Sequence, residues 1–297
     1  LLSRGLGDVY KRQYFDNAAT TKVFPEVKDL VVKLMEEDYG NPSSLHQKGL
    51  DAGHYIKETK EILAKEWKVD SKEIVLTSGG TESNNLALIG AALANKRSGN
   101  RIITSKVEHA SVSSTMAFLE SLGFEVVYLN VDHQGIVDLE QLEQEVNEDT
   151  ILVSVMYVNN EIGAVEPIQK IAEIIKEKNP KTLFHVDAIQ AFGKYHIYPK
   201  RMGIDLMSVS GHKIHGPKGT GALFIKNRTK VKPIIYGGGQ QDGMRSGTEN
   251  VPGFAGFGLA TKMVYEDLEA RTVRMRAVKD RLMERLKALP DLSLIHI

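Results

Sequence analysis

Short apolar segments alternate with amphipathic helical patterns through most of this 297-residue chain. The helical patterns separate the earlier apolar segments, at residues 81–96, 110–122, 139–146 and 168–178. Strands separated by helices pair in parallel through right-handed crossovers, and the helices cover both faces of the sheet. We therefore expect a three-layer α/β fold with a mostly parallel seven-stranded sheet, partly antiparallel where short connections join the last strands. The predicted strands cover residues 73–77, 101–105, 125–129, 150–157, 182–186, 204–209 and 221–225.

Further helices are expected on both sides of this alternating region. One begins at Phe24-Pro25, because proline is favoured in the first turn of a helix, and a second covers residues 50–67. After the run Gly253-Phe254-Ala255-Gly256, a long charged helix is predicted over residues 259–289. Its apolar stripe has nothing after it to pack on. The predicted stripes contain Val27, Leu30, Val31 and Leu34 in the first helix, and Met263, Leu268, Val273, Val278, Leu282 and Leu286 in the last.

These patterns predict four regions along the chain. Residues 14–258 would form a large domain, and residues 259–291 would lead into a small C-terminal domain that is largely missing. Residues 1–13 show no helical or strand period and no initiating methionine, and residues 292–297 interrupt a helical pattern. Both ends resemble translated adapter sequence. We therefore expect a foreign or disordered leader, a foreign tail and a C-terminally truncated chain.

The charges of the chain cancel, with 38 Lys and Arg residues against 38 Asp and Glu residues. Without a net charge, nothing draws the protein to nucleic acid or to an anionic membrane, so we expect neither as a partner. We expect a cytoplasmic location, since no apolar run approaches the roughly 20 residues of a membrane helix and no signal-peptide pattern occurs. The sequence contains no cysteine, which excludes disulfides and thiolate metal sites within it.

An acid and a lysine follow two successive buried strands of the predicted sheet. Asp187 ends an apolar strand, where an unpaired charge would be costly. Lys213 follows the next strand, at the end of the run Ser210-Gly211-His212-Lys213. In pyridoxal phosphate (PLP) sites a lysine forms the Schiff base and an acid pairs with the protonated pyridine nitrogen. The two residues together indicate a PLP site, whereas a loop lysine alone is more often solvated.

The run Thr77-Ser78-Gly79-Gly80-Thr81-Glu82-Ser83 joins a predicted strand to a predicted helix. Its small residues let backbone N–H groups and hydroxyls close around an anion at the helix N-terminus. This pattern is typical of a phosphate-binding turn, and a capped helix with a tight turn is the alternative. The run is not a P-loop, because the required Gly-Lys-Ser/Thr does not follow a glycine at the right spacing.

Polar side chains follow two further strands at the same edge, where open α/β folds bind ligands. His109 could stack on a PLP ring and take part in proton transfer, and a purely structural histidine is the alternative. Asn160 could donate a hydrogen bond to a phenolate oxygen or a substrate carboxylate, and ordinary turn formation is the alternative.

Two other groups of polar residues allow a binding role. Arg245 lies in a glycine-rich loop and could bind a phosphate or carboxylate, unless it is an exposed surface arginine. His212 and His215, with His185 nearby, could suggest a metal cluster. No carboxylate or fourth ligand stands at a suitable spacing, so we expect no metal site.

Taken in order, these segments closely resemble the cysteine desulfurase branch of the class-V aminotransferase family, which has fold type I among PLP enzymes. The resemblance extends from Tyr14 to the helix before Pro290. Each motif is weak alone, but their order is highly specific. The motifs are Ser-Gly-Gly-Thr-Glu-Ser from Ser78, Glu-His from Glu108, Val-Asn-Asn-Glu-Ile-Gly from Val158, His-Val-Asp-Ala-Ile-Gln from His185, Ser-Gly-His-Lys from Ser210 and Arg-Ser-Gly-Thr-Glu-Asn from Arg245.

The resemblance implies roles for individual residues. Lys213 would bind PLP covalently and shuttle a proton, Asp187 would pair with the pyridine nitrogen, and His109 would stack on the ring, with Lys213 and His109 as the catalytic residues. Asn160 and Gln190 would contact the phenolic oxygen and the substrate side. The phosphate would be held by Gly80, Thr81, Ser210 and His212, and by Thr248 from the other subunit of a homodimer. The substrate-binding residues would be Asn17, Asn160 and Arg245.

The family reaction converts L-cysteine to L-alanine and leaves a persulfide on a catalytic cysteine, from which sulfur passes on. The family's cysteine and its carboxylate-binding arginine lie beyond the last residue of this sequence. We therefore expect a cysteine desulfurase of which this chain is the cofactor-binding part, unable to form the persulfide. Its substrate would be L-cysteine, and its protein partner a sulfur acceptor such as an iron–sulfur scaffold.

The sequence allows two alternatives. One is another PLP enzyme of the same family, such as a selenocysteine lyase or an aminotransferase. The other is a non-catalytic scaffold that binds sulfur acceptors without turnover and does not bind PLP. The intact Lys213 and Asp187 favour a PLP enzyme over the scaffold.

Overall fold

The computed structural model describes residues 14–289, so the leader and tail expected at residues 1–13 and 292–297 lie outside the described residues. It contains a seven-stranded sheet with the order β1-β7-β6-β5-β4-β2-β3. Strand β7 is antiparallel to both β1 and β6, and the remaining pairs are parallel. The predicted α/β architecture is therefore confirmed. The strands are β1 Ile74–Thr77, β2 Arg101–Ser105, β3 Glu125–Leu129, β4 Thr150–Met156, β5 Leu183–Asp187, β6 Leu206–Ser210 and β7 Gly221–Ile225.

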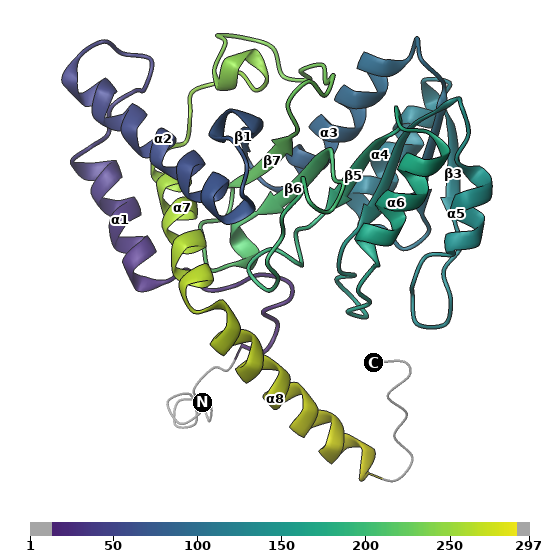
Figure 1. The fold of residues 1–297 in the computed structure, drawn as a ribbon. Coiled ribbons are helices and arrows are strands. Elements are labelled where there is room, and N and C mark those ends of the chain that lie inside the picture. The colour runs from purple at the N-terminus through teal and green to yellow at the C-terminus, as the bar shows by residue number, and fades with distance from the viewer. Residues whose placement is uncertain (1–13, 290–297) are drawn as a thin grey trace, which may run out of the picture.

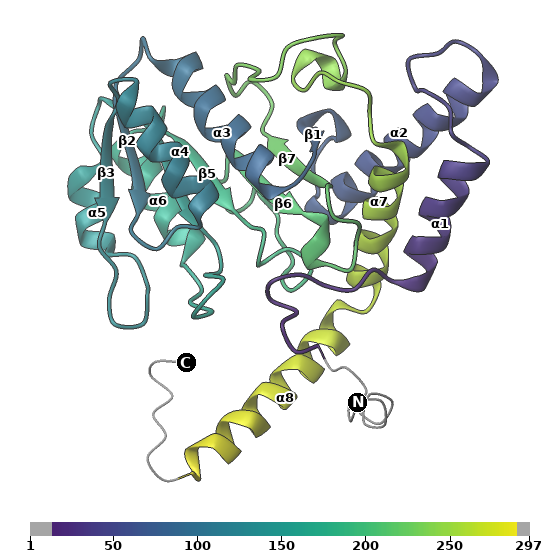
Figure 2. The same ribbon diagram turned by 180° about the vertical axis from the view of Figure 1, so that it is seen from behind.

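Helices cover both faces of this sheet (Figures 1 and 2). α3 and α4 lie on one face, while α2, α5, α6 and α7 lie on the other. The predicted bounds agree with the observed ones within three residues as far as α6. The helices are α1 Pro25–Glu36, α2 Gln47–Trp67, α3 Gly80–Asn95, α4 Ala110–Ser121, α5 Leu139–Glu145, α6 Ile168–Lys178, α7 Val251–Glu266 and α8 Leu268–Lys287, with short 3₁₀ helices η1 Ser71–Glu73, η2 Gly211–Lys213 and η3 Gln241–Gly243.

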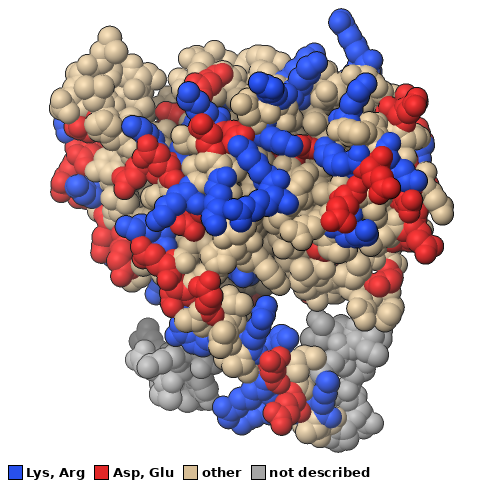
Figure 3. All heavy atoms as spheres, in the orientation of Figure 1, with Lys and Arg blue, Asp and Glu red and all other residues tan. Residues whose placement is uncertain are grey.

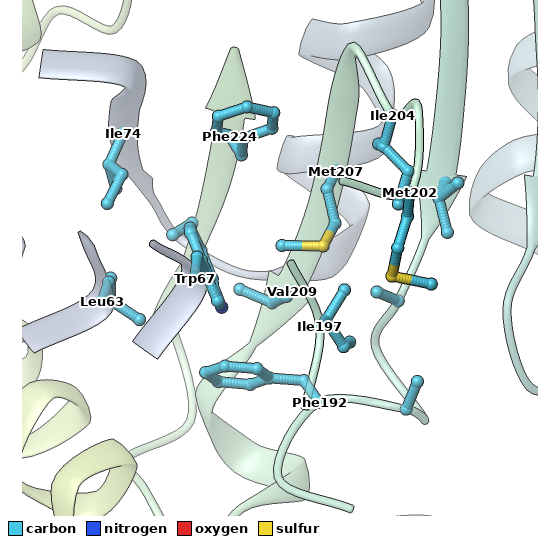
Figure 4. Close-up of a cluster of buried hydrophobic side chains, with 14 of the residues drawn as sticks. Leu63, Trp67, Ile74, Phe192, Ile197, Met202, Ile204, Met207, Val209 and Phe224 are labelled. Atoms are coloured by element: carbon cyan, nitrogen blue, oxygen red, sulfur yellow. The ribbon is translucent and has the colours of Figure 1, made fainter. Parts of the chain in front are cut away.

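All strands except β3 are buried on both faces, which explains why they read as continuous apolar runs, whereas β3 at the edge of the sheet is mostly half-buried. Neighbouring residues alternate between the two cores: Val75 packs toward α3 and α4, whereas Leu76 packs into the larger core on the other side. Figure 4 shows part of that larger core, where Trp67 of α2 lies over Val209 of β6 and Phe192. The sheet is thus a rigid platform on which strand ends are held in place.

The end of the described chain differs from the single helix predicted over residues 259–289. The structure has two helices, and α7 already begins at Val251. The predicted helix starts only after the glycines of this segment, because glycine is a poor helix former. Here they let α7 approach its neighbours closely, since a Cβ on Gly256 would lie 2.8 Å from Val31 and one on Gly258 would lie 2.9 Å from Thr59. Asp267, with φ −125° and ψ 27°, separates the two helices.

Helix α8 projects away from the rest of the structure (Figures 1 and 2). Leu268 at its start is buried, but Val273 and Val278 are each about two-thirds exposed. The exposed stripe expected from the sequence is therefore present. The boundary between a large domain and a following helix, placed at residues 258 and 259, falls within α7 and stays a prediction.

The surface carries both signs of charge. On the face shown in Figure 3, acidic and basic side chains are interspersed, and a band of Lys and Arg crosses the middle. None of the helices within residues 14–289 combines the length and apolar character that crossing a membrane requires.

Candidate active site

A cavity of about 240 Å³ lies at the carboxyl edge of the parallel strands. The ends of β4, β5 and β6, the loop after β2 and the first turn of α3 all contribute to it, as the topology predicts for an open α/β sheet. Nine of the ten predicted cofactor-binding residues line this one cavity. They are Gly80, Thr81, His109, Asn160, Asp187, Gln190, Ser210, His212 and Lys213.

Asp187 supplies a buried carboxylate at the end of β5, with 4% of the residue exposed. Its Oδ1 accepts a hydrogen bond from the Ile189 N–H at 3.0 Å, and its Oδ2 accepts one from Asn84 Nδ2 at 2.8 Å. Burial raises the pKa of Asp187, while these hydrogen bonds and the charges of His109 and Lys213 oppose the rise. Within residues 14–289, Asp187 forms no ion pair. A cation in the cavity would therefore stabilise its charged form.

Lys213 places its amine in the same cavity from η2, directly after β6. Its Nζ donates to the Ala18 carbonyl oxygen at 2.5 Å, and Gln190 Nε2 donates to the same oxygen at 3.0 Å. Burial lowers the pKa of Lys213, against the opposing charges of Asp16 and Asp187. A lowered pKa increases the fraction of neutral amine, which is the nucleophilic form.

The segment that carries Ala18 is fixed onto the Lys213 loop. The Thr21 N–H and hydroxyl both donate to the His212 carbonyl oxygen, at 2.9 and 2.7 Å, and the His215 N–H donates to Thr21 Oγ1 at 2.7 Å. In Figure 1 this purple segment runs along the lower edge of the sheet, on the side from which α8 projects. The N-terminal segment thus forms one wall of the lysine's surroundings.

The first turn of α3 provides a place for an anion. Gly79 has a φ of 148°, and a Cβ on Gly80 would lie 2.0 Å from Ile189 Cδ1, so both positions favour glycine. The helix that starts here is 16 residues long, and its N-terminal dipole attracts negative charge. Beside this turn, where a Cβ on Gly80 would lie 3.7 Å from Ser210 Cβ, Ser210 Oγ is buried and has no hydrogen-bond partner among the described residues. A phosphate oxygen would satisfy this hydroxyl.

His109 lines the cavity as the N-cap of α4. Its Nδ1 accepts from the Ser111 N–H at 3.1 Å and lies 2.8 Å from Ser111 Oγ. The loop that carries His109 is joined to the end of β4, because Glu108 Oε1 accepts from the Met156 N–H at 3.0 Å and Asn159 Nδ2 donates to the Val107 carbonyl at 3.1 Å. Glu108 is followed directly by His109, and Asn159 by Asn160. Each linking residue therefore precedes a residue that lines the cavity.

Three predicted site residues are not part of the cavity lining. Arg245 forms an ion pair with Glu82, Nε to Oε1 at 2.8 Å, and Glu82 also accepts from the Ser78 N–H at 2.9 Å. This pairing links the loop of Arg245 to the turn before α3. Asn17 and Thr248 are exposed. Their substrate and phosphate roles stay predictions.

Sequence reasoning missed residues that support or line the site. Asn84 contacts Asp187 from behind the cavity, and its spacing of four residues from Gly80 could have placed both on one helix face. Ser111, two residues after His109, could have been recognised as a partner of a histidine N-cap. The remaining lining residues are Ala19, Met156, Val158 and Ile189.

The histidines considered as a metal cluster have other partners. His185 is fully buried between Ser154 Oγ at 2.8 Å and Ser208 Oγ at 3.0 Å, and burial lowers its pKa to about 3. His212 Nδ1 lies 3.2 Å from Thr20 Oγ1, and His215 Nδ1 lies 2.8 Å from the Lys22 carbonyl oxygen. Within residues 14–289 no three His, Asp or Glu residues are grouped as metal ligands.

Comparisons with known proteins identify the class of this protein. The model of the aminotransferase class-V family matches residues 13–297. A solved structure named NifS-like protein superposes with a TM-score of 0.92 and 41% identity, over 94% of this chain and 77% of that one. The structure titled "SspA in complex with cysteine" has a TM-score of 0.80 and 40% identity, over 84% of this chain and 72% of that one. The chain belongs to the aminotransferase class-V family, whose members depend on PLP.

Curated relatives place it more narrowly within that family. It is 44% identical to the cysteine desulfurase IscS of Methanosarcina thermophila, over 96% of this chain and 70% of that protein. It is 45% identical to the cysteine desulfurase IscS of Dictyoglomus turgidum, over 90% of this chain and 67% of that protein. The resemblance inferred from the motifs is therefore confirmed.

Proposed function

We propose that this chain binds PLP in the cavity and is the cofactor-binding part of a cysteine desulfurase. One observation carries the proposal: the buried carboxylate of Asp187 and the amine of Lys213 face the same cavity, beside the Ser210 hydroxyl, which has no partner within residues 14–289. Asp187 offers a partner for a protonated ring nitrogen, Lys213 an amine for an aldehyde, and Ser210 with the α3 N-terminus a place for a phosphate. The residues present therefore fit PLP.

The chemistry divides between the cofactor and the protein. Bound PLP would supply an electron sink for charge that develops on the substrate α-carbon. Asp187 would hold a proton on the ring nitrogen, because its buried carboxylate is stabilised by that positive charge. Lys213 Nζ would take the proton from the α-carbon and return it, because a lowered pKa increases the fraction of neutral amine that can accept a proton. His109 would cover the ring and present its imidazole to the reacting groups.

The proposed reaction takes L-cysteine to L-alanine and transfers its sulfur. Sulfur transfer in this way needs a thiol acceptor, and this chain contains no cysteine. We therefore propose that the polypeptide by itself does not form the persulfide. A thiol from outside this sequence would receive the sulfur, before it passes to an acceptor such as an iron–sulfur scaffold protein.

The homodimer is also part of this proposal. Thr248 is exposed and outside the cavity of its own chain, so a role in phosphate binding requires that it reach another subunit. Mixing a Thr248→Ala chain with a Lys213→Ala chain tests this, since shared sites would give mixed dimers with altered PLP affinity. The cytoplasmic location expected from the sequence likewise stays a prediction, which cell fractionation can test.

The absorbance spectrum of the purified protein with added PLP tests the central proposal. We expect a visible band that borohydride fixes covalently, and its absence in a Lys213→Ala variant. L-cysteine should perturb the band, while production of sulfide and alanine stays at background. A folded parent protein without the band would overturn PLP binding and favour a scaffold. Perturbation by selenocysteine but not by cysteine would instead favour a selenocysteine lyase.

A further inference from the structure

A hydrogen-bonded network behind the cavity connects Asp187 to His109. Its centre is Asn84 of α3, whose side chain is fully buried. Asn84 Nδ2 donates to Asp187 Oδ2 at 2.8 Å and to Ser111 Oγ at 2.9 Å. An amide nitrogen carries two hydrogens, so both are used. Ser111 Oγ in turn lies 2.8 Å from His109 Nδ1.

The direction of these hydrogen bonds is fixed from the Asp187 end. In its ionised form the carboxylate of Asp187 only accepts, so the amide nitrogen of Asn84, not its oxygen, faces it. Ser111 Oγ accepts the second hydrogen of this nitrogen, which leaves its own hydrogen free to donate. His109 Nδ1 is the nitrogen in reach, and it also accepts from the Ser111 backbone N–H at 3.1 Å. Two donors thus converge on Nδ1.

We propose that Asn84 and Ser111 are positioning residues that fix the neutral tautomer of His109 with its hydrogen on Nε2. An Nδ1 that receives two hydrogen bonds has no room for a hydrogen of its own. Nε2 forms no hydrogen bond with a residue of the described part of the chain, and His109 lines the cavity. The neutral imidazole therefore offers the cavity a hydrogen-bond donor rather than a lone pair.

The same network gives Asn84 a second task. Its amide holds Asp187 Oδ2 while it sets the direction of the Ser111 hydroxyl, so one buried side chain orients the two groups that would flank the cofactor ring. The catalytic role of this tautomer, in which His109 donates a proton to the bound ligand, rests on the proposed function. The presence of the tautomer does not depend on the proposed function, and it can be measured without PLP.

The first experiment is ¹⁵N NMR of histidine-labelled protein without PLP, near neutral pH. Long-range ¹H–¹⁵N correlations distinguish a protonated ring nitrogen from an unprotonated one. A His109→Asn variant, which can still cap α4, assigns the His109 signals. We expect Nε2 to carry the hydrogen and Nδ1 to be unprotonated. The opposite tautomer would overturn the proposal, whether or not the protein binds PLP.

Two variants test the contribution of each positioning residue. Ser111→Ala removes the hydroxyl but keeps the backbone donor, so the His109 Nδ1 resonance should shift as it loses one hydrogen bond. Asn84→Leu should shift the same resonance by releasing the Ser111 hydroxyl. Asn85→Leu is the matched control, since Asn85 lies next on α3 and donates to the Thr81 carbonyl instead.

The expected pattern is a shift in the first two variants and none in the control, with the other histidine signals unchanged. Circular dichroism confirms folding. Should Asn84→Leu fail to fold, Ser111→Ala still tests the network through a smaller change. An unchanged His109 Nδ1 resonance in folded Ser111→Ala would overturn the proposed network. An unchanged resonance in folded Asn84→Leu would remove Asn84 from it.

Discussion

Two buried aspartates lie at opposite edges of the same sheet, each with 4% of its surface exposed. Asp205, near the amino end of β6, is fully paired: its carboxylate contacts Lys176 Nζ at 2.7 Å and Lys226 Nζ at 3.0 Å, and accepts from the Phe184 N–H at 3.0 Å. Asp187, at the carboxyl end of β5, accepts only from neutral N–H groups among the described residues.

The difference in partners indicates that Asp205 serves the fold, whereas Asp187 is suited to bind a ligand. Removing a buried carboxylate that has its own cations destabilises the fold, because those cations lose their partner. A buried carboxylate without a cation destabilises the fold unless a ligand supplies one. Burial alone does not distinguish the two cases, whereas the partners do.

The largest expected effect is at Asp205, the aspartate that is paired with lysines. Asp205→Asn should lower the free energy of unfolding by about 3 kcal/mol, because Lys176 and Lys226 lose their shared anion. Urea unfolding without PLP measures this. Glu173→Gln is the control, since its pair with Lys170 is exposed on both sides and should change stability by less than about 0.5 kcal/mol. A loss for Asp205→Asn no larger than that of the control would contradict the comparison.

The next effect concerns the turn before α3. Gly80→Ala should lower the free energy of unfolding by about 2 kcal/mol, because its Cβ would lie 2.0 Å from Ile189 Cδ1. Gly53→Ala offers the opposite case within α2, where nothing lies within 4 Å of the new Cβ, and should stabilise by about 0.5–1 kcal/mol. Thermal unfolding of the pair checks both signs. Equal changes in the two variants would show that Ile189 moves aside without cost.

Glu108, at the carboxyl edge of the sheet, makes the stability of the protein depend on pH. Its carboxyl is buried, and burial raises its pKa from 4.5 to about 8. Between these values the folded protein keeps a proton that the unfolded chain has released, so this group makes stability fall as the pH rises from about 4.5 to 8. Glu108→Gln is neutral throughout and should reduce that slope by up to about 1.4 kcal/mol per pH unit. Urea unfolding at pH 6 and 8 tests it, and an unchanged slope would show that Glu108 is ionised in the folded state.

The sequence predicted the sheet well because buried parallel strands are continuous apolar runs separated by helices. It also placed Asp187 and Lys213 at one edge of that sheet, since Asp187 directly follows one such run and Lys213 comes shortly after the next. It did not predict the first half of α7, where packing against α1 and α2 outweighs the low helix propensity of Gly256 and Gly258. Asn84 was missed because its partners Ser111 and Asp187 lie 27 and 103 residues away in sequence, and its spacing from Gly80 was the one local signal.

Apart from the control variants, the smallest change in stability is expected at Asp187, and this change is the sharpest test of the comparison. Asp187→Asn removes a buried charge that has no ion pair in the described chain, but it also replaces one hydrogen-bond acceptor by a donor. The two effects oppose each other, so the free energy of unfolding without PLP should change by less than about 1 kcal/mol. Under the proposed function, the same variant should weaken PLP binding at least tenfold, because the cationic ring nitrogen loses its anionic partner.

Urea unfolding and a PLP titration of Asp187→Asn, run beside Asp205→Asn, therefore give two independent results. If Asp187→Asn destabilises the protein as much as Asp205→Asn does, Asp187 already serves the fold and the comparison fails. If stability is unchanged and PLP still binds with the affinity of the parent, the comparison holds, but the pyridine nitrogen is not the cationic partner of Asp187. Only unchanged stability together with weakened PLP binding would show that the carboxylate of Asp187 serves as a partner of the cofactor.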